Sequence, residues 1–227
     1  MGERTKGIII AIDGPSGAGK STVARLLADR LGYVHIDTGA MFRAAALLIE
    51  QSGINPADLC AFSRFCQELD IRFENHQGTL TVIANGADVT HQIRSPEISR
   101  LTSRISALKP VRDALLASQR RMGIEGGVVL EGRDIGTVVF PDAELKFYLF
   151  ASAEERGRRR FDELTAKGER VTLQDTIADV ARRDLQDSER EIAPLCQAED
   201  AVVIDSSFIT VENVLDMMED MFLKRLL

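Results

Sequence analysis

The chain has 227 residues, of which 44% are hydrophobic and 28% are charged, and its formal net charge is −7. The excess of acidic residues argues against a general nucleic-acid binder, because the phosphate backbone would repel most of the surface. No apolar stretch approaches the ~20 residues that a membrane-spanning helix needs, and the polar start lacks a signal-peptide pattern, so we expect a cytoplasmic protein with no membrane partner.

The first predicted strand, Ile8–Ile12, leads into a glycine-rich loop and then a predicted helix from Lys20 to about Leu31. Glycines let successive backbone N–H groups curve around a phosphate, and the helix N-terminus adds the positive end of its dipole. The pattern predicts that Lys20 reaches the β- and γ-phosphates of a nucleoside triphosphate and that Ser21 helps to hold a magnesium ion. The loop fits G-x-x-x-x-G-K-[ST] in full, with Gly14, Pro15, Ser16, Gly17, Ala18, Gly19, Lys20 and Ser21.

A second short strand, Tyr33–Ile36, ends at Asp37-Thr38-Gly39, and a helix is predicted to resume near Ala40. Ligands of open α/β sheets bind at the carboxyl ends of the strands. Arg43 is therefore a candidate to bind a second phosphate through its guanidinium. The simpler interpretation is that Asp37 and Thr38 only cap the helix, and capping does not exclude ligand contact.

The hydrophobic pattern changes in the middle of the chain, after one further predicted helix. Asn55-Pro56 predicts a helix start, with a capping side chain followed by proline at the first helical position. From Asp70 to Val89 the hydrophobic period changes to two, which predicts three short antiparallel strands separated by glycine turns. Two helices are predicted next, near Pro96–Leu108 and Pro110–Arg121. We interpret the change to antiparallel strands over 70–89 as an insert within an α/β chain.

Three more core strands are predicted at Val128–Leu130, Leu145–Leu149 and Ala201–Ile204. A charged helical stretch, roughly Ala153–Asp187, separates the last two, and a final helix starts at Thr210. Strands that alternate with helices imply a parallel sheet covered by helices on both faces.

Charged residues cluster at two further places. Glu131-Gly132-Arg133-Asp134 directly follows a predicted strand, where phosphate-loop enzymes position magnesium, although a solvated turn is the alternative. Arginines crowd one face of a predicted helix at 156, 159 and 160, and a second face carries Arg183, Asp187 and Arg190. A solvated basic helix is the usual explanation, but like charges repel at this spacing and a polyphosphate would relieve the repulsion.

Cysteines and histidines give no site signal. The odd number of cysteines and the lack of a C-x-x-C motif predict neither a disulfide framework nor a zinc site. The histidines lack metal-ligand spacing. We interpret most of these six residues as core or surface positions: Cys60, Cys66, Cys196, His35, His76 and His91.

Over nearly its whole length the chain resembles the bacterial cytidylate kinases, which are nucleoside monophosphate kinases. The shared strings are GPSGAGKS at 14–21, DTGAMFR at 37–43, IRSPE at 93–97, EGRDIGTVVFPDA at 131–143 and RRD…R…APL across 182–195. The resemblance implies an α/β P-loop NTPase fold of three layers with a five-stranded parallel sheet. It also implies one kinase core over 1–227, an antiparallel insert that binds the monophosphate over 70–110, and a helical lid over 154–170.

The resemblance further implies transfer of the γ-phosphoryl group of ATP to CMP or dCMP, with Mg²⁺ as the cofactor. Residues 14–22, Gly14 to Thr22, would hold ATP, and Ser21 would bind the metal, with Glu131 as a second candidate acting through water. Lys20, Arg133, Arg156 and Arg160 are the expected catalytic residues. The expected substrate-binding residues are Asp37 and Thr38, then Ser103, Arg112 and Asp134 for cytosine, Arg43, Arg133 and Arg190 for the monophosphate, and Arg183 with Asp187 for the sugar.

Two positions depart from the family pattern. Family members often have Asp where Glu131 stands, so the carboxylate here sits on an arm that is longer by one methylene. Many have Tyr where Phe42 stands, so any role of a hydroxyl is lost at this position.

Two alternative functions are weighed against this expectation. The first is a phosphate-loop kinase for another small acceptor, such as another monophosphate or shikimate. The insert at 70–89 and the GRDxGT string argue against it. A nucleotide-gated switch would need a guanine-reading Asn-Lys-x-Asp motif, which the chain lacks. We expect a monomer that binds ATP and CMP or dCMP.

Overall fold

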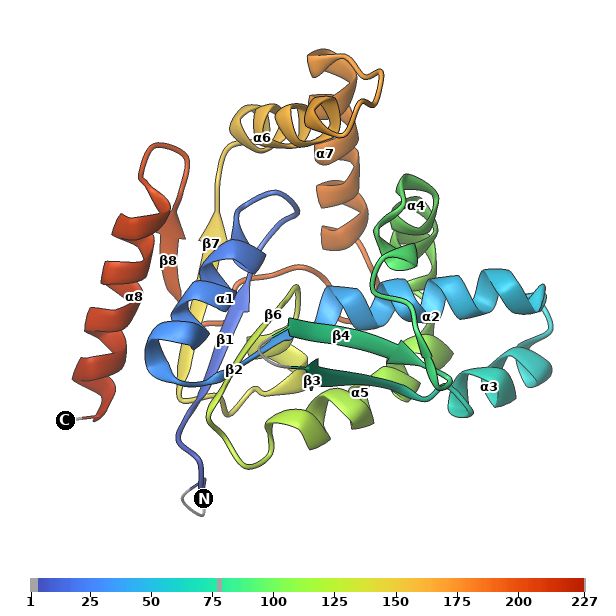
Figure 1. The fold of residues 1–227 in the computed structure, drawn as a ribbon, viewed down its shortest axis with the longest axis horizontal. Coiled ribbons are helices and arrows are strands. Elements are labelled where there is room, and N and C mark those ends of the chain that lie inside the picture. The colour runs from blue at the N-terminus through green and yellow to red at the C-terminus, as the bar shows by residue number, and fades with distance from the viewer. Residues whose placement is uncertain (1–3, 77–78, 227) are drawn as a thin grey trace. The chain divides into compact units, whose positions relative to one another are not determined.

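The computed structural model describes residues 4–76 and 79–226, which separate into two compact units (Figure 1). The first unit comprises residues 1–36 and 123–227, and the second comprises Asp37–Met122. The expected insert over 70–110 lies inside the second unit. Within the described ranges, none of the helices combines the length and the apolar character needed to cross a bilayer.

The first unit is built on a five-stranded sheet in the order β2-β6-β1-β7-β8. Strand β1 pairs in parallel with β6 and with β7, and β7 pairs in parallel with β8. The strands and helices of this unit are β1 (Ile9–Asp13), α1 (Lys20–Leu31), β2 (Val34–Asp37), β6 (Val128–Gly132), the π-helical turn η2 (Ile135–Val139), β7 (Leu145–Phe150), α6 (Ala153–Ala166), α7 (Leu173–Ser188), β8 (Val202–Asp205) and α8 (Val211–Leu226).

The centre of this sheet is apolar because the first four residues of its middle strand are three isoleucines and an alanine. All five residues of β1 are buried, as expected for a parallel strand with both faces covered. Helix α1 packs against α8 and against β6, and its buried stripe joins the core through Val23, Ala24 and Leu27. Gly32, with φ 66°, ends α1 in the left-handed conformation that a C-cap glycine adopts.

The charged stretch after β7 folds as two helices rather than one. Helices α6 and α7 pack against each other (Figure 1), and Gly168, with φ 82°, lies in the connection between them. Gly157 allows their close approach, because a Cβ at this position would lie 2.8 Å from the Cα of Ile177. We call the pair the α6–α7 hairpin; the lid expected over 154–170 corresponds to most of α6 and part of the connection, and α7 lies beyond it.

The second unit has its own core, formed by the buried faces of its helices and by the antiparallel sheet β3-β4-β5. Strand β4 pairs in antiparallel fashion with both β3 and β5, as the hydrophobic period of two predicted. The elements of this unit are α2 (Thr38–Ser52), α3 (Leu59–Gln67), β3 (Ile71–His76), β4 (Thr79–Ala84), β5 (Ala87–Asp88), η1 (Gln92–Arg94), α4 (Pro96–Ile105) and α5 (Lys109–Gly123).

The parallel sheet and the antiparallel insert confirm the expected fold class. One local prediction was wrong, because the third helix begins at Leu59 and not at Asn55-Pro56. Asn55 instead accepts a hydrogen bond of 3.0 Å at Oδ1 from the backbone N–H of Ala57, which makes an Asx turn. Asp58 provides the N-cap by accepting from the N–H of Ala61 at 3.1 Å. Both stretches carry capping chemistry, and the second one starts the helix.

Candidate functional site

The phosphate loop connects β1 to α1 in the conformation that its glycines allow. Gly14 has φ 146°, and a Cβ at this position would lie 1.9 Å from the carbonyl oxygen of Leu149. A side chain would therefore collide with the backbone of β7, which is why only glycine fits between the two strands. Gly19, with φ 92°, precedes the first residue of α1, so this N-terminus opens into the loop.

Lys20 lies inside the phosphate loop. Its side chain is 6% exposed, and Nζ donates a hydrogen bond of 2.7 Å to the carbonyl oxygen of Pro15. Burial and, to a smaller extent, the nearby Arg133 charge together lower the pKa of Lys20 to about 7, against the opposing effects of Glu131 and Asp13. A buried amine that is destabilised as a cation gains most from an anionic ligand, which is the situation a bound polyphosphate creates.

The hydroxyl of Ser21 and the carboxylate of Glu131 lie together at the start of α1. Ser21 Oγ donates to Glu131 Oε2 at 2.7 Å, and His35 Nε2 lies 3.0 Å from Glu131 Oε1. Glu131 is 3% exposed, so the carboxylate is shielded from solvent. Sequence reasoning found Ser21 and Glu131 but missed His35, because nothing in its spacing shows that β2 and β6 are neighbours.

These oxygens fit the requirements of a magnesium ion. Mg²⁺ prefers hard oxygen donors and is usually bound by one or two carboxylates together with substrate phosphates, and by no dedicated protein cage. Among the described residues, no group of three or more His, Cys, Asp or Glu side chains could hold a metal alone. The hydroxyl–carboxylate pair of Ser21 and Glu131 is therefore suited to a metal that arrives with the nucleotide.

Asp13 fixes the turn that follows Asp134. Its Oδ1 accepts from the N–H of Ile135 at 2.8 Å, and its Oδ2 accepts from the N–H of Gly136 at 2.7 Å. Burial raises the pKa of Asp13 to about 6, although these two hydrogen bonds lower it in part. The buried Asp134 thus lies directly before a turn that is held at both of its first N–H groups.

Asp187 accepts hydrogen bonds from three other residues of the first unit, Arg133, Arg190 and Leu195. Arg133 Nε donates to Asp187 Oδ2 at 2.9 Å. The main-chain oxygen of Asp187 accepts from Arg190 Nε at 3.2 Å and from the N–H of Leu195 at 2.8 Å. The structure therefore brings Arg133, Asp187 and Arg190 together, and their expected role in substrate binding stays a prediction.

Two further arginines lie near this cluster. Burial lowers the pKa of Arg183, and the charges of Arg160 and Arg133 also lower it, against the opposing effect of Asp187. Arg160 donates to Glu163 within α6 at 2.7 Å. Because the charges of Arg160 and Arg133 disfavour the charged form of Arg183, a bound anion would relieve the repulsion between these guanidinium groups.

Arg156 connects the phosphate loop to the α6–α7 hairpin. Its Nε donates to the carbonyl of Ala151 at 2.7 Å, and its Nη1 donates to the carbonyl of Ser16 at 3.0 Å. Its Nη2 pairs with Asp184 at 2.6 Å, and the residue is 5% exposed. Arg156 therefore lies beside the phosphate loop, and its expected role in catalysis stays a prediction.

In the second unit, Asp37 and Arg43 form a pair at the start of α2. Asp37 Oδ1 accepts from the N–H of Ala40 at 3.0 Å, which confirms its capping role, and Asp37 Oδ2 accepts from Arg43 Nη2 at 2.7 Å. Thr38 is the first residue of the helix and is buried. The carboxylate holds the guanidinium of Arg43 in place, and the expected contact of these residues with a ligand stays a prediction.

The expected cytosine-binding residues of the second unit also lie near one another. Arg112 is 8% exposed, donates from Nη1 to the carbonyl of Ser106 at 2.9 Å, and lies 5.3 Å from the centroid of the Phe42 ring. Ser106 Oγ donates in turn to the carbonyl of Ser103 at 3.1 Å. Phe42 therefore supports Arg112 through its ring face, a contact that needs no tyrosine hydroxyl.

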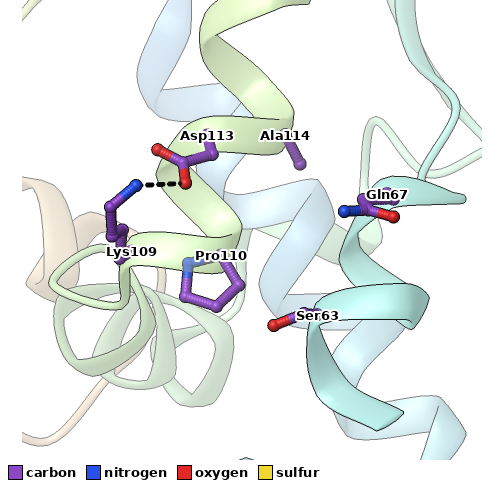
Figure 2. A pocket seen from close by; sticks show the side chains of 6 residues that line it. All are labelled: Ser63, Gln67, Lys109, Pro110, Asp113 and Ala114. Carbon is purple, nitrogen blue, oxygen red and sulfur yellow. Dashed lines mark hydrogen bonds and ion pairs between the residues drawn. The ribbon is translucent and has the colours of Figure 1, made fainter. Parts of the chain in front are cut away.

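The second unit contains a cavity that the expected site does not use. The cavity has a volume of about 370 Å³ and lies beside α3 and α5 (Figure 2). Lys109 Nζ donates to Asp113 Oδ2 at 2.6 Å along its wall. No residue expected in substrate binding is among those that line it: Ser63, Gln67, Lys109, Pro110, Asp113 and Ala114.

Comparison with known proteins places the chain in a family. The family model described as cytidylate kinase matches residues 10–224. A cytidylate kinase of Citrifermentans bemidjiense is 60% identical over 98% of this chain and 96% of its own length. A cytidylate kinase of Geobacter sulfurreducens is 61% identical over 97% of this chain and 94% of its own length.

One solved structure that the chain matches is a more distant relative in sequence. A shikimate kinase from Acinetobacter baumannii, solved in complex with shikimate, has a TM-score of 0.47 and 15% sequence identity, with 97% of this chain and 95% of that chain covered. The family rests instead on the sequence matches, which run through the phosphate loop, the Glu131 segment and the α6–α7 hairpin. The chain belongs to the cytidylate kinase family, and it is an enzyme.

Proposed function

We propose that this chain transfers the γ-phosphoryl group of ATP to CMP or dCMP, giving ADP and CDP or dCDP. The observation that carries the proposal is the phosphate loop with its buried Lys20, in the same unit as the arginine cluster around Asp187. One anion-binding element fits the donor triphosphate, and the second fits the phosphate of an acceptor. The relatives that are 60% and 61% identical to this chain are cytidylate kinases, which supports CMP as that acceptor.

The proposed reaction needs alignment and charge neutralisation more than proton transfer. An ionised oxygen of the CMP phosphate forms a bond to the γ-phosphorus, and the bond from that phosphorus to the bridging oxygen of ADP breaks. No general base is required because the acceptor oxygen carries no proton. Lys20, Arg133, Arg156 and Arg160 are the proposed catalytic residues, which stabilise the charge of the transferring group. A single arginine contributes ~10³–10⁵ in rate in such enzymes.

The other residues are proposed to bind and orient the two nucleotides. Residues 14–22 hold ATP, and Ser21 binds Mg²⁺, with Glu131 acting through water. The bound ion neutralises charge on the β- and γ-phosphates. In the acceptor, the monophosphate is proposed to contact Arg43, Arg133 and Arg190, and the sugar is proposed to contact Arg183 and Asp187. Cytosine is proposed to contact Ser103, Arg112 and Asp134. Asp37 and Thr38, at the start of α2, are also proposed to bind the acceptor.

A coupled assay for ADP tests the activity directly. We expect rapid ADP formation with CMP and dCMP, slower formation with UMP, and only background with shikimate or with water as the acceptor. Chelation of Mg²⁺ by EDTA should abolish turnover, and Lys20→Ala should reduce kcat by at least ~10³-fold. Slow ATP hydrolysis that does not respond to CMP would instead support a nucleotide-gated switch and contradict the proposal.

We also propose that the enzyme is a cytoplasmic monomer. The support is the formal net charge of −7, which disfavours association between copies of the chain, and the three free cysteines, which fit a reducing compartment. Light scattering coupled to gel filtration should give a mass near the 25.0 kDa of one chain. A mass of two chains or more at micromolar concentration would contradict this part.

A further inference from the structure

Three side chains from three elements form a continuous hydrogen-bonded row in the first unit. Ser21 at the start of α1 donates to Glu131 Oε2 at 2.7 Å, and His35 of β2 lies with Nε2 3.0 Å from Glu131 Oε1. The side chain of Glu131 is 4% exposed and that of His35 is 17% exposed. The row is therefore largely shielded from water, and each carboxylate oxygen has a different partner.

The contact with His35 bears on how the carboxylate is oriented. The terminal torsion of glutamate is broad, so one hydrogen bond leaves the carboxylate free to rotate. Glutamate also has one rotatable bond more than aspartate, which increases the freedom that must be lost. A partner on each oxygen removes this freedom, because Oε1 cannot turn away from His35 without Oε2 leaving Ser21.

We propose that His35 is a positioning residue for the Ser21–Glu131 pair, and so for the metal–nucleotide complex that this pair receives. The proposal rests on the Mg²⁺ site proposed above. Because an ionised carboxylate only accepts hydrogen bonds, Nε2 of His35 carries the proton in this contact. The imidazole does not contact the substrate; it acts by keeping Glu131 Oε2 directed at the hydroxyl of Ser21.

The proposal is tested by metal binding as well as by turnover. Mn²⁺ is titrated into the enzyme saturated with the non-hydrolysable analogue AMPPNP, and bound metal is measured by electron paramagnetic resonance. We expect His35→Leu to weaken Mn²⁺ binding by ~10-fold, as losses of hydrogen bonds to metal ligands typically do. His35→Gln should stay within about threefold of the wild type, because its amide N–H can replace Nε2–H.

Two further measurements separate positioning from a purely structural role. AMPPNP affinity in the presence of EDTA should change by less than about twofold in His35→Leu, because the phosphate loop itself is unaltered. His91→Leu, at an exposed histidine of the second unit, is the matched control and should leave Mn²⁺ affinity unchanged. If His35 acts through Glu131, adding His35→Leu to Glu131→Gln should weaken Mn²⁺ binding by less than about twofold beyond Glu131→Gln alone.

Each outcome decides the proposal. Wild-type Mn²⁺ affinity in His35→Leu overturns it, and so does a His35→Gln variant as weak as His35→Leu. Should His35→Leu fail to fold, His35→Asn replaces it. The asparagine amide is too short to reach the position of Nε2, so the His35→Asn variant should bind Mn²⁺ as weakly as is expected for His35→Leu. Failure of the wild type to bind Mn²⁺ more tightly with AMPPNP than without it would instead reject the proposed metal site itself.

Discussion

Arg133 and Asp187 lie 54 positions apart in the chain and are joined by a hydrogen bond of 2.9 Å from Nε to Oδ2. This contact connects the segment after β6 to the end of α7. The carboxylate is largely buried and also lies 3.8 Å from Nη1 of Arg190. One acidic side chain therefore sets the position of two guanidinium groups that are proposed to bind the acceptor phosphate.

Asp187→Asn should reduce kcat/KM for CMP by about 10- to 100-fold, since the amide keeps one acceptor oxygen but loses the charge that orients both arginines. The KM for ATP should stay within about twofold, because the phosphate loop is unaffected. Steady-state kinetics with each substrate varied in turn measures both values. An equal loss for both substrates would show that Asp187 holds the fold of the unit and does not act on the acceptor site.

Asp134→Asn should shift base preference from CMP toward UMP. Cytosine offers an amino donor that a carboxylate can accept, whereas uracil has a carbonyl at that position, which would face the Asp134 carboxylate unfavourably. Removing this mismatch should be worth about 1–3 kcal/mol, which is roughly 5- to 150-fold in the ratio of kcat/KM values. Parallel assays with both nucleotides give the ratio, and an unchanged ratio would show that Asp134 does not read the base.

Asp13 should make stability depend on pH in an uncommon direction for a carboxylate. Burial raises its pKa in the folded state from 3.8 to about 6, so the native state holds a proton in the window between these values that the unfolded chain has lost. The free energy of unfolding should therefore decrease as pH rises from about 4 to about 6. The raised pKa corresponds to about 3 kcal/mol at most.

Urea unfolding of the wild type and of Asp13→Asn at a series of pH values tests this contribution. The variant should lack this part of the pH dependence, so the difference between the two proteins changes through the window. It should also be less stable by about 1–3 kcal/mol near pH 4, because its NH₂ group faces one of the two backbone N–H donors. Parallel curves for the two proteins would contradict the raised pKa.

Gly157→Ala should destabilise the α6–α7 hairpin even though alanine is the better helix former. The added methyl would lie 2.4 Å from Cγ1 and 2.8 Å from Cα of Ile177, so the two helices must move apart. We expect a loss of about 1–3 kcal/mol, measured by thermal unfolding. Adding Ile177→Ala removes the Cγ1 contact alone and should restore part of the loss; full additivity of the two losses would contradict the steric explanation.

The segment from Arg156 to Lys167 should exchange its amide hydrogens faster without ligand than with ATP and CMP bound. Closure over both substrates would keep water from acting as the acceptor. Hydrogen exchange followed by mass spectrometry, with AMPPNP in place of ATP, gives the protection of this segment. Equal protection with and without nucleotides would show that the hairpin is not a lid, and β1 serves as the internal reference because all five of its residues are buried.

Local patterns were enough to predict most elements of the fold. The buried run of β1 and the phosphate loop carry their signals within a few neighbouring residues, and so do the alternating strands β3 and β4. The start of α3 was predicted wrongly, because Asn55 and Asp58 both have capping side chains. The choice between them depends on the packing of the helix, which places buried Phe62 and Cys66 on one face.

The sequence predicted which residues belong to the candidate site, but it did not predict all of the contacts between them. Glu131 was found because it directly follows the predicted strand Val128–Leu130, although β6 extends through it to Gly132. Its partner His35 belongs to a neighbouring strand and lies 96 positions away in the chain. The order of the strands depends on how the whole sheet folds, so the spacing of residues within one segment cannot predict which strands are neighbours. The arginine face of α6 was also visible, whereas the internal partners of Arg156, the carbonyls of Ala151 and Ser16, were not.

The three contacts of Arg156 have a mechanical consequence. The same guanidinium holds a carbonyl of the phosphate loop and a carboxylate of α7, so the hairpin cannot shift relative to the loop without breaking or redirecting one of these bonds. A ligand that favours one arrangement of the loop therefore biases the hairpin, and by thermodynamic reciprocity a shift of the hairpin changes the affinity for that ligand by the same factor. Buried Arg156 therefore links the phosphate loop directly to the hairpin, and through this link the proposed donor binding and the proposed hairpin movement would be coupled.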